Sequence, residues 1–151
     1  MKINEVCQEM KIYNQSIFSN PSAICLEIGI ILEKLGSLVN LNENEHFDVR
    51  VILSELLQNA LRHGNQMDEN KKIQLDVSLA DGELLHISVL DEGPGFDVSQ
   101  TLIQKRDRAF RSENIFEMEE CGRGLMIIET LCDSVIRNDM GNWITVQKQL
   151  H

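Results

Sequence analysis

Three short stretches of the chain combine a carboxylate, an amide and paired glycines in an order that suits a phosphate ligand. They are E-L-L-Q-N at 55–59, D-E-G-P-G at 91–95 and G-R-G-L at 122–125. Glu55 and Asn59 are four residues apart in a segment with helical spacing, so they share one helix face. Glycines let the backbone approach a ligand closely, and a helix start offers free N–H groups to phosphate. We interpret the three stretches as one pocket for a nucleotide and its magnesium ion.

The apolar spacing predicts the elements that position these stretches. A helix is expected over 23–38, because Asn20 can cap it and Pro21 suits its first turn. The remaining expected elements are a short helix over 4–10, a loop over 40–46, helices over 48–63 and 122–132, and strands over 11–18, 73–79, 84–90, 133–138 and 143–150. Each of the three stretches therefore lies on a helix or at the end of a strand.

The segment 73–79 alternates strictly between apolar and polar residues, which predicts a sheet with one apolar and one polar face. Such a sheet needs helices on its apolar side only. We therefore predict an α/β fold, a two-layer α/β sandwich with a mixed sheet and its helices on one face. A length of 151 residues fits a single domain spanning 1–151.

The composition limits the classes of function. A net charge of −10, from 24 acidic and 14 basic residues, argues against direct binding to nucleic acid and is compatible with a basic protein partner. Apolar runs are too short for a membrane span, and the first residues lack the apolar core of a signal peptide. We expect a cytoplasmic protein with no membrane association. Its four cysteines show no metal-binding spacing, so we expect reduced thiols.

Longer phrases around the three stretches carry a family resemblance. They are Arg62-His63-Gly64, D-E-G-P-G-F-D at 91–97 and G-R-G-L-M-I-I-E-T-L-C-D at 122–133. In their order they resemble the N, G1 and G2 boxes of the GHKL ATPases, and within that superfamily they are most similar to the anti-sigma-factor serine/threonine kinases of bacterial sporulation and stress response. The likeness runs from about residue 12 to residue 150. It implies the GHKL (Bergerat) fold, with ATP or ADP and Mg²⁺ as ligands.

The resemblance also implies roles for single residues. Asn59 would be the magnesium ligand, and one carbonyl is enough because magnesium keeps waters and substrate phosphates as its other ligands. Glu55 would orient or deprotonate the attacking group. Asp91 would accept a hydrogen bond from the adenine amine. The other residues expected to contact the nucleotide are His63, Gly93, Gly95, Arg111, Gly122, Arg123, Gly124, Leu125 and Asn142. The position of His63 at a helix end favours a structural role over a catalytic one.

Two further regions, the connection before the third stretch and the turn before the last strand, bear on how the nucleotide would be held. The connection 95–122 is long and irregular, which is typical of a functional lid or a disordered loop, and in the resembling family it is the lid over ATP. Which of its cations, Lys105, Arg106, Arg108 or Arg111, would meet the γ-phosphate stays open. Members of the family commonly carry Gly-Thr before the last strand, where this chain has Gly141-Asn142. Because asparagine also hydrogen-bonds water, we expect altered contacts to the base and not loss of binding.

The resemblance implies a kinase that is also an anti-sigma factor. Such a protein binds a sigma factor in one state and phosphorylates a serine on a small anti-anti-sigma (STAS-type) antagonist in another, and it often forms a homodimer. Two alternatives stay open. One is a stand-alone histidine-kinase-like ATPase module acting on a separate phosphotransfer protein. The other is a nucleotide-sensing regulator that transfers no phosphate, because fold resemblance does not establish chemistry.

Overall fold

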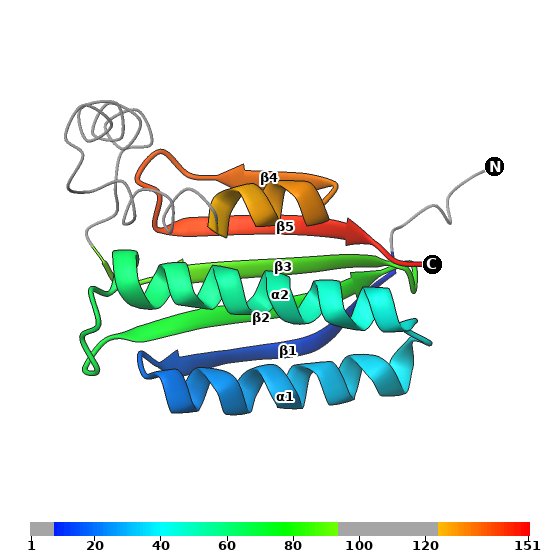
Figure 1. Ribbon diagram of the computed structural model, residues 1–151, viewed down its shortest axis with the longest axis horizontal. Helices are drawn as coiled ribbons and strands as arrows, with labels where there is room; N and C mark the ends of the chain where they lie inside the picture. The colour runs from blue at the N-terminus through cyan, green and yellow to red at the C-terminus, as the bar shows by residue number, and fades with distance from the viewer. Residues whose placement is uncertain (1–7, 94–123) are drawn as a thin grey trace.

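The computed structural model describes residues 8–93 and 124–151, and all statements on the structure concern these two ranges. The elements follow one another as β1 (Glu9–Phe18), α1 (Pro21–Leu38), α2 (Glu43–Asn59), the π-helical turn η1 (Ala60–Gly64), β2 (Lys72–Ala80), β3 (Leu84–Asp91), an unlabelled helix over 124–131, β4 (Ser134–Arg137) and β5 (Trp143–Gln149) (Figure 1). The expected strands and the three longer helices are therefore present, with ends shifted by a few residues.

The strands form one sheet in the order β1-β2-β3-β5-β4, and all four pairings are antiparallel. The predicted mixed sheet is therefore wrong for the strands described. Two tight hairpins reverse the chain between β2 and β3 and between β4 and β5. The α1–α2 pair returns the chain to the end of β1 that it left, so that Phe18 pairs with Lys72 at the start of β2. A parallel neighbour would have needed a crossover to the opposite end of the sheet.

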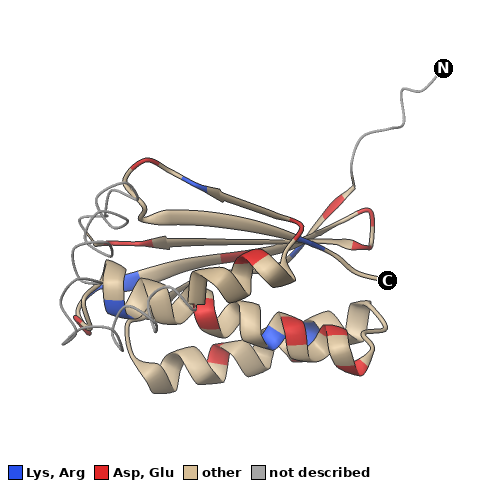
Figure 2. Cartoon of the chain, turned by 45° about the horizontal axis from the view of Figure 1, so that its top comes forward, with Lys and Arg blue, Asp and Glu red and all other residues tan. Residues whose placement is uncertain are grey.

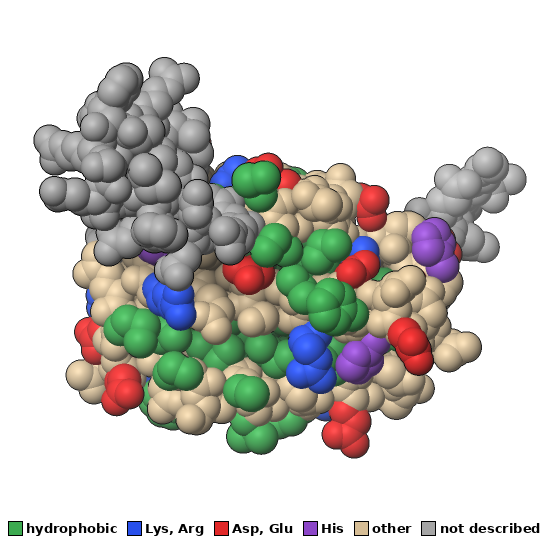
Figure 3. Space-filling model, in the orientation of Figure 1, with side chains coloured by type: hydrophobic (Ala, Val, Ile, Leu, Met, Phe, Trp, Pro, Cys, Tyr) green, Lys and Arg blue, Asp and Glu red, His purple; other side chains and the backbone are tan. Residues whose placement is uncertain are grey.

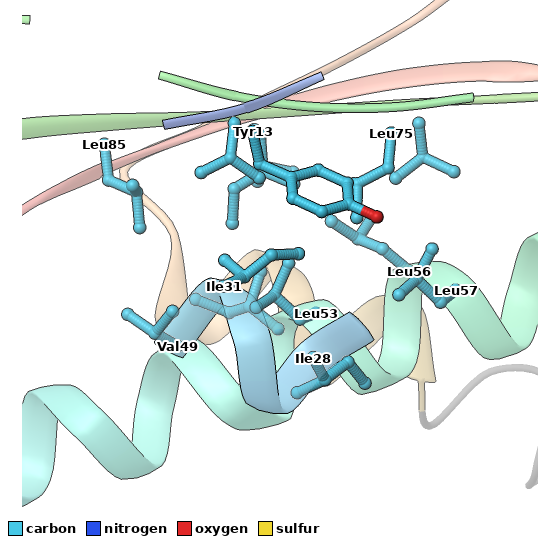
Figure 4. Packing of buried hydrophobic residues seen from close by; sticks show 14 of the residues in the cluster. Tyr13, Ile28, Ile31, Val49, Leu53, Leu56, Leu57, Leu75 and Leu85 are labelled. Atoms are coloured by element: carbon cyan, nitrogen blue, oxygen red, sulfur yellow. The ribbon is translucent and has the colours of Figure 1, made fainter. Parts of the chain in front are cut away.

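All three longer helices lie on one face of the sheet, which confirms the predicted α/β two-layer arrangement (Figures 1 and 2). The alternating segment places Ile73, Leu75 and Val77 in the core, each without exposed surface. Their partners from the helix layer include Leu53 and Leu56, and Figure 4 shows these side chains interleaved between the sheet and the helices. This core fixes α2 across the middle of the sheet.

The predicted start of α1 is confirmed in detail. Asn20 caps the helix, and its side-chain oxygen accepts a hydrogen bond from the Ala23 N–H at 2.9 Å. Pro21 follows as the first helical residue, where its missing N–H costs nothing because that position has no partner within the helix. The two residues together set the point at which the chain leaves β1 and crosses onto the helix layer.

The expected loop over 40–46 is confirmed for residues 40–42 and wrong from Glu43 onward, because α2 begins there. Asn42 and Glu45 form a capping box: the Asn42 side chain accepts from the Glu45 N–H at 2.8 Å, and the Glu45 carboxylate accepts from the Asn42 N–H at 3.2 Å. The run is polar because it supplies caps and first-turn residues, and an asparagine followed three residues later by glutamate is a known sign of a helix start.

The other end of this helix also departs from expectation. The predicted helix runs to His63, whereas α2 ends at Asn59 and continues as η1. In η1 the Asn65 N–H donates to the Ala60 carbonyl oxygen five residues earlier, at 2.7 Å. One extra residue is thereby inserted directly after Asn59. Turns of this kind are frequent at functional sites, since they change the direction of the side chains that follow.

Two further expectations concern the first residues and the membrane. The predicted short helix over 4–10 is wrong where it can be compared, because Glu9 and Met10 belong to β1; residues 1–7 lie outside the described ranges. Within those ranges, no helix has the length and apolar character needed to span a membrane.

Candidate functional site

Glu55 and Asn59 lie one turn apart near the end of α2, and both side chains are half-buried. The apolar residues Leu53, Leu56 and Leu57 occupy the opposite side of the helix and are buried in the core. The packing of α2 on the sheet therefore turns the carboxylate and the amide away from the core, as the sequence predicts for one shared face.

The third stretch meets the first at Gly124. A Cβ atom added to Gly124 would lie 2.7 Å from Glu55 Oε2 and 3.7 Å from Asn59 Oδ1. Gly124 is buried and is the first described residue of the helix over 124–131. The backbone at Gly124 therefore approaches both side chains directly. Residues separated by about 65 positions are thus brought together as predicted.

The second stretch forms a separate cluster at the end of β3. The Asp91 N–H donates to the Asn142 carbonyl oxygen at 3.0 Å, and the Asp91 carboxylate accepts from the Gly93 N–H at 2.9 Å. The Asp91 side chain is buried, and this burial raises its pKa, while the hydrogen bond from Gly93 and the charge of Lys71 act in the opposite direction. The site thus holds a carboxylate with few solvent contacts and a defined orientation.

Two glycines shape the space around this carboxylate. A Cβ on Gly64 would overlap the Asp91 carboxylate, and a Cβ on Gly93 would overlap the Gly64 carbonyl group. Gly64 is the last residue of η1, so the turn that follows Asn59 packs directly on the Asp91 segment. This contact joins the two clusters and gives a steric reason for the glycine in the phrase Arg62-His63-Gly64.

Asn142 lies beside Asp91, as expected, but its side-chain oxygen is already engaged. That oxygen accepts a hydrogen bond from the Asn138 side-chain amide at 2.6 Å across the turn before β5. Gly141 precedes it with φ of +77°, a conformation that glycine adopts without strain. Asn142 therefore contributes its backbone carbonyl to the Asp91 segment, and its side chain holds the turn.

The remaining predicted residues divide into those described and those not. His63 is exposed in η1, and Leu125 is half-buried in the helix over 124–131. Gly95, Arg111, Gly122 and Arg123 lie outside the described residues, as do the other lid cations. Within 8–93 and 124–151, no three His, Cys, Asp or Glu side chains are grouped so that they could hold a metal ion.

One residue of the site was missed by the sequence analysis. Asn65 has no exposed surface, and its side chain makes three hydrogen bonds. Its amide nitrogen donates to Ser19 Oγ at 2.5 Å and to the Lys72 carbonyl oxygen at 2.9 Å, and its oxygen accepts from the Glu92 N–H at 2.8 Å. In the sequence, the pair Gly64-Asn65 indicates only a turn.

Comparison with known protein families gives a match that spans the site. The family described as the histidine kinase-like ATPase domain matches residues 27–148 of the chain. The matched range includes Glu55, Asn59, Asp91 and the third stretch, together with both clusters of the site.

Individual relatives carry more specific names. Serine-protein kinase RsbW of Bacillus subtilis (strain 168) is 29% identical over 128 residues, which cover 82% of this chain and 79% of the relative. The anti-sigma F factor of Clostridium perfringens (strain 13 / Type A) is 30% identical over 107 residues, covering 69% and 72%. The anti-sigma F factor of Shouchella clausii (strain KSM-K16) is 33% identical over 106 residues, covering 68% of each chain.

Proposed function

The chain belongs to the histidine kinase-like ATPase domain family, and on that premise we propose that it is an ATP-dependent serine/threonine protein kinase that acts as an anti-sigma factor. Relatives of about 30% identity named serine-protein kinase RsbW and anti-sigma F factor support both parts of this proposal. The substrate we propose is a serine of an anti-anti-sigma protein of the STAS type. ATP binding follows from the family, whereas the roles of the individual residues are part of the proposal.

The observation that carries the proposal is the approach of Gly124 to Glu55 and Asn59. A carboxylate and an amide oxygen lie beside the first described residue of the helix over 124–131, and the free backbone N–H groups at a helix N-terminus attract phosphate. Phosphate oxygens held there would lie beside both side chains. A base, a metal ligand and an anion site are therefore within one small region, which is what phosphoryl transfer requires.

The proposed reaction uses Glu55 as the general base. The serine oxygen of the substrate forms a bond to the γ-phosphorus, and the bond from that phosphorus to the bridging oxygen of the β-phosphate breaks. The serine proton passes to the Glu55 carboxylate, and ADP leaves with the electron pair of the broken bond. A base in hydrogen-bond reach contributes typically 10²- to 10⁴-fold, and positioning supplies much of the rest.

Asn59 fits the part of a magnesium ligand. Its side-chain carbonyl oxygen is the hard donor that Mg²⁺ prefers, and it lies on the same side of α2 as the Gly124 backbone. When bound, the ion would neutralise charge on the phosphate oxygens and leave its other positions to water and phosphate. Asn59 itself would hold the ion one helical turn from the base.

Asp91 fits the part of the adenine receptor. A buried carboxylate, oriented by the Gly93 N–H, accepts hydrogen bonds and offers none while ionised. The exocyclic amine of adenine is a donor, whereas guanine presents a carbonyl oxygen at the same position and would be repelled. The proposal therefore includes a preference for ATP over GTP.

The helix layer offers a surface for a protein partner. Leu26 and Ile30 are neighbours one turn apart on α1 and are 65% and 36% exposed, and Phe47 on α2 is 63% exposed. Figure 3 views this side and shows hydrophobic side chains among the polar ones. An acidic chain with exposed apolar groups suits a basic, partly apolar partner such as the sigma factor we propose.

The experiment follows phosphate from γ-labelled ATP into proteins of the native cell extract, with Mg²⁺ and with the metal chelated. An acid-stable label on one small protein, present only with Mg²⁺, is the expected result. An acid-labile label would indicate transfer to histidine and overturn the serine kinase in favour of the histidine-kinase-like module. If the purified protein binds ATP and no protein is labelled, the sensing regulator replaces the kinase.

A further inference from the structure

We propose that Asn65 is a positioning residue that holds the Asp91 segment in place and thereby sets the preference for adenine. The inference rests on the proposed function, because it assumes that Asp91 meets the base of ATP. Asn65 belongs to none of the three stretches. The later residues that its side chain contacts are Lys72 and Glu92, which follow it by 7 and 27 positions. Its contacts nevertheless connect the segments that surround Asp91.

Asn65 joins four parts of the chain. Its backbone N–H closes η1, and its side chain reaches Ser19 at the corner between β1 and α1, the Lys72 carbonyl at the start of β2, and the Glu92 N–H just after β3. Glu92 stands between Asp91, whose carboxylate would meet the base, and Gly93, which orients that carboxylate. Asn65 thus connects η1 to the residue that follows Asp91, in addition to the backbone bond from Asp91 to Asn142.

The chemistry of the position calls for an asparagine. The amide group donates two hydrogen bonds from its nitrogen and accepts one at its oxygen, within 2.5–2.9 Å, and the residue has no exposed surface. An aspartate would lose both donors and bury a charge, a serine would be too short, and an alanine would remove all three hydrogen bonds, one of them to the buried Ser19. No other residue type meets all three partners at this length.

The carboxylate of Glu92 reinforces the same connection. It accepts from the Lys72 N–H at 2.5 Å, while the Lys72 carbonyl oxygen accepts from the Asn65 amide, so Glu92 and Asn65 both bind the start of β2. Gly64, the neighbour of Asn65, lies against the Asp91 carboxylate. Without Asn65, the segment that carries Asp91 would be less firmly held against the turn that packs on it.

The test compares Asn65→Ala with Asn42→Ala in the full chain. Asn42 caps the far end of α2, so its loss also destabilises the protein but leaves the Asp91 segment untouched. The measurements are the Kd values for ATP and GTP, Tm, and the rate of phosphoryl transfer at saturating ATP. For Asn65→Ala we expect ATP binding weaker by about tenfold or more and a clearly smaller ratio of the GTP Kd to the ATP Kd. The saturated rate should change little.

A purely structural role predicts another pattern. Both variants would then lower Tm, and both would keep the wild-type ratio of the two Kd values; this result would overturn the assignment. If the wild-type protein itself binds ATP no better than GTP, the proposed function of Asp91 fails and the assignment fails with it. An unchanged ratio in Asn65→Ala beside a clear wild-type preference refutes Asn65 alone.

A second measurement needs no variant. The Glu92 amide donates to the Asn65 side chain, although the Glu92 residue itself is exposed. Hydrogen exchange followed by NMR in the nucleotide-free protein should therefore show a protected Glu92 amide. Exchange at the rate of an unstructured amide would show that Asn65 does not hold the segment, and would overturn the proposal even if Asn65→Ala does not fold.

Discussion

Gly64 lies against Asp91 so closely that any side chain at position 64 would occupy the space of the Asp91 carboxylate. The contact joins the π-helical turn after Asn59 to the end of β3, and so connects two of the three sequence stretches. The glycine at this position is therefore explained by the space that the Asp91 carboxylate occupies, and not by the geometry of the π-helical turn. The consequences of changing either residue follow from this contact.

Gly64→Ala should weaken nucleotide binding more than it weakens the fold. The atoms nearest to the added methyl group would be those of the Asp91 carboxylate, so the change should act first on the orientation of this side chain. The rotated carboxylate no longer faces the base, and the loss of one hydrogen bond to a charged group costs about 1.5–3 kcal/mol, or roughly 10- to 150-fold in Kd. Calorimetric titration with ATP measures this change.

Gly29→Ala is the matched control for that substitution. Gly29 lies in the exposed part of α1, and an added Cβ would have no neighbour within 4 Å. Replacing a helical glycine by alanine should stabilise the protein by about 0.5–1 kcal/mol and leave ATP binding unchanged. If Gly64→Ala bound ATP as tightly as Gly29→Ala does, the Gly64–Asp91 contact would have no role in binding.

Asp91→Asn should weaken ATP binding and stabilise the nucleotide-free protein. The amide would present a donor toward the adenine amine, so ATP affinity should fall by about tenfold or more while GTP is no longer disfavoured. Burial raises the pKa of Asp91, which means that the folded protein binds this proton more tightly than the unfolded chain does. The contribution of Asp91 to stability is therefore full at acidic pH and is lost as the pH rises through the folded-state pKa.

The neutral amide of the Asp91→Asn variant avoids the free-energy cost of burying an ionised carboxylate. At pH 7 the nucleotide-free Asp91→Asn protein should melt at a higher temperature than wild type, and the difference should shrink below the ordinary pKa of the carboxyl, near 3.8. Thermal unfolding followed by circular dichroism at several pH values measures this. A variant that is less stable than wild type at pH 7 would show that the ionised carboxylate is favoured in the folded protein.

Asn59→Ala should remove the effect of magnesium on ATP binding. Wild-type protein should bind ATP more tightly with Mg²⁺ than with the metal chelated, because Asn59 would add a ligand to the ion. In the variant the two affinities should become equal. Gln58→Ala, one residue earlier and also half-buried, should keep the wild-type difference. A magnesium effect that survives in Asn59→Ala would assign the ion to other residues.

Glu45→Gln should reduce stability in a pH-dependent way. The Glu45 carboxylate accepts from the His151 N–H at 2.7 Å and from the Asn42 N–H, and the bond from His151 is the main reason that its pKa is lowered. The stability that it contributes is present above the ordinary pKa of 4.5 and is lost as the pH falls through the folded-state value. We expect the variant to be less stable than wild type at pH 7.

Thermal unfolding between pH 3 and pH 7 follows this difference, which should close at the acidic end. Glu43→Gln is the control, because Glu43 lies exposed in the same first turn. A difference between Glu45→Gln and wild type that stays constant over the whole pH range would rule out the ionised carboxylate as its source.

Local patterns predicted most of the fold. The alternation in β2 and the helical spacing of α1 and α2 depend on burial, and burial is readable from residue types. The start of α2 differs from the prediction because the polar run 40–46 is typical of a loop, although Asn42 and Glu45 within it carry a capping signal. The antiparallel sheet could not be derived, since strand direction depends on where each connection returns.

The site was partly predictable for a similar reason. Glu55 and Asn59 share a face by helical geometry alone, and Gly124 joins them as the resemblance implies. The π-helical turn was not predictable, because residue types do not distinguish its backbone hydrogen bond from Asn65 to Ala60 from the bonds of an ordinary α-helix. The role of Asn65 was not predictable, because its side chain bonds to residues distant in sequence. A buried asparagine with three partners has no local pattern that distinguishes it from an asparagine in a surface turn.

The most direct test of the central claim is the rate of phosphoryl transfer by Glu55→Gln, measured with ATP affinity on the same purified protein. The exposed Glu129→Gln, in the helix over 124–131, is the control. We predict a rate lower by about 10²- to 10⁴-fold in Glu55→Gln, with ATP affinity and the Glu129→Gln rate close to wild type. A Glu55→Gln protein that binds ATP and transfers phosphate at the wild-type rate would contradict the account.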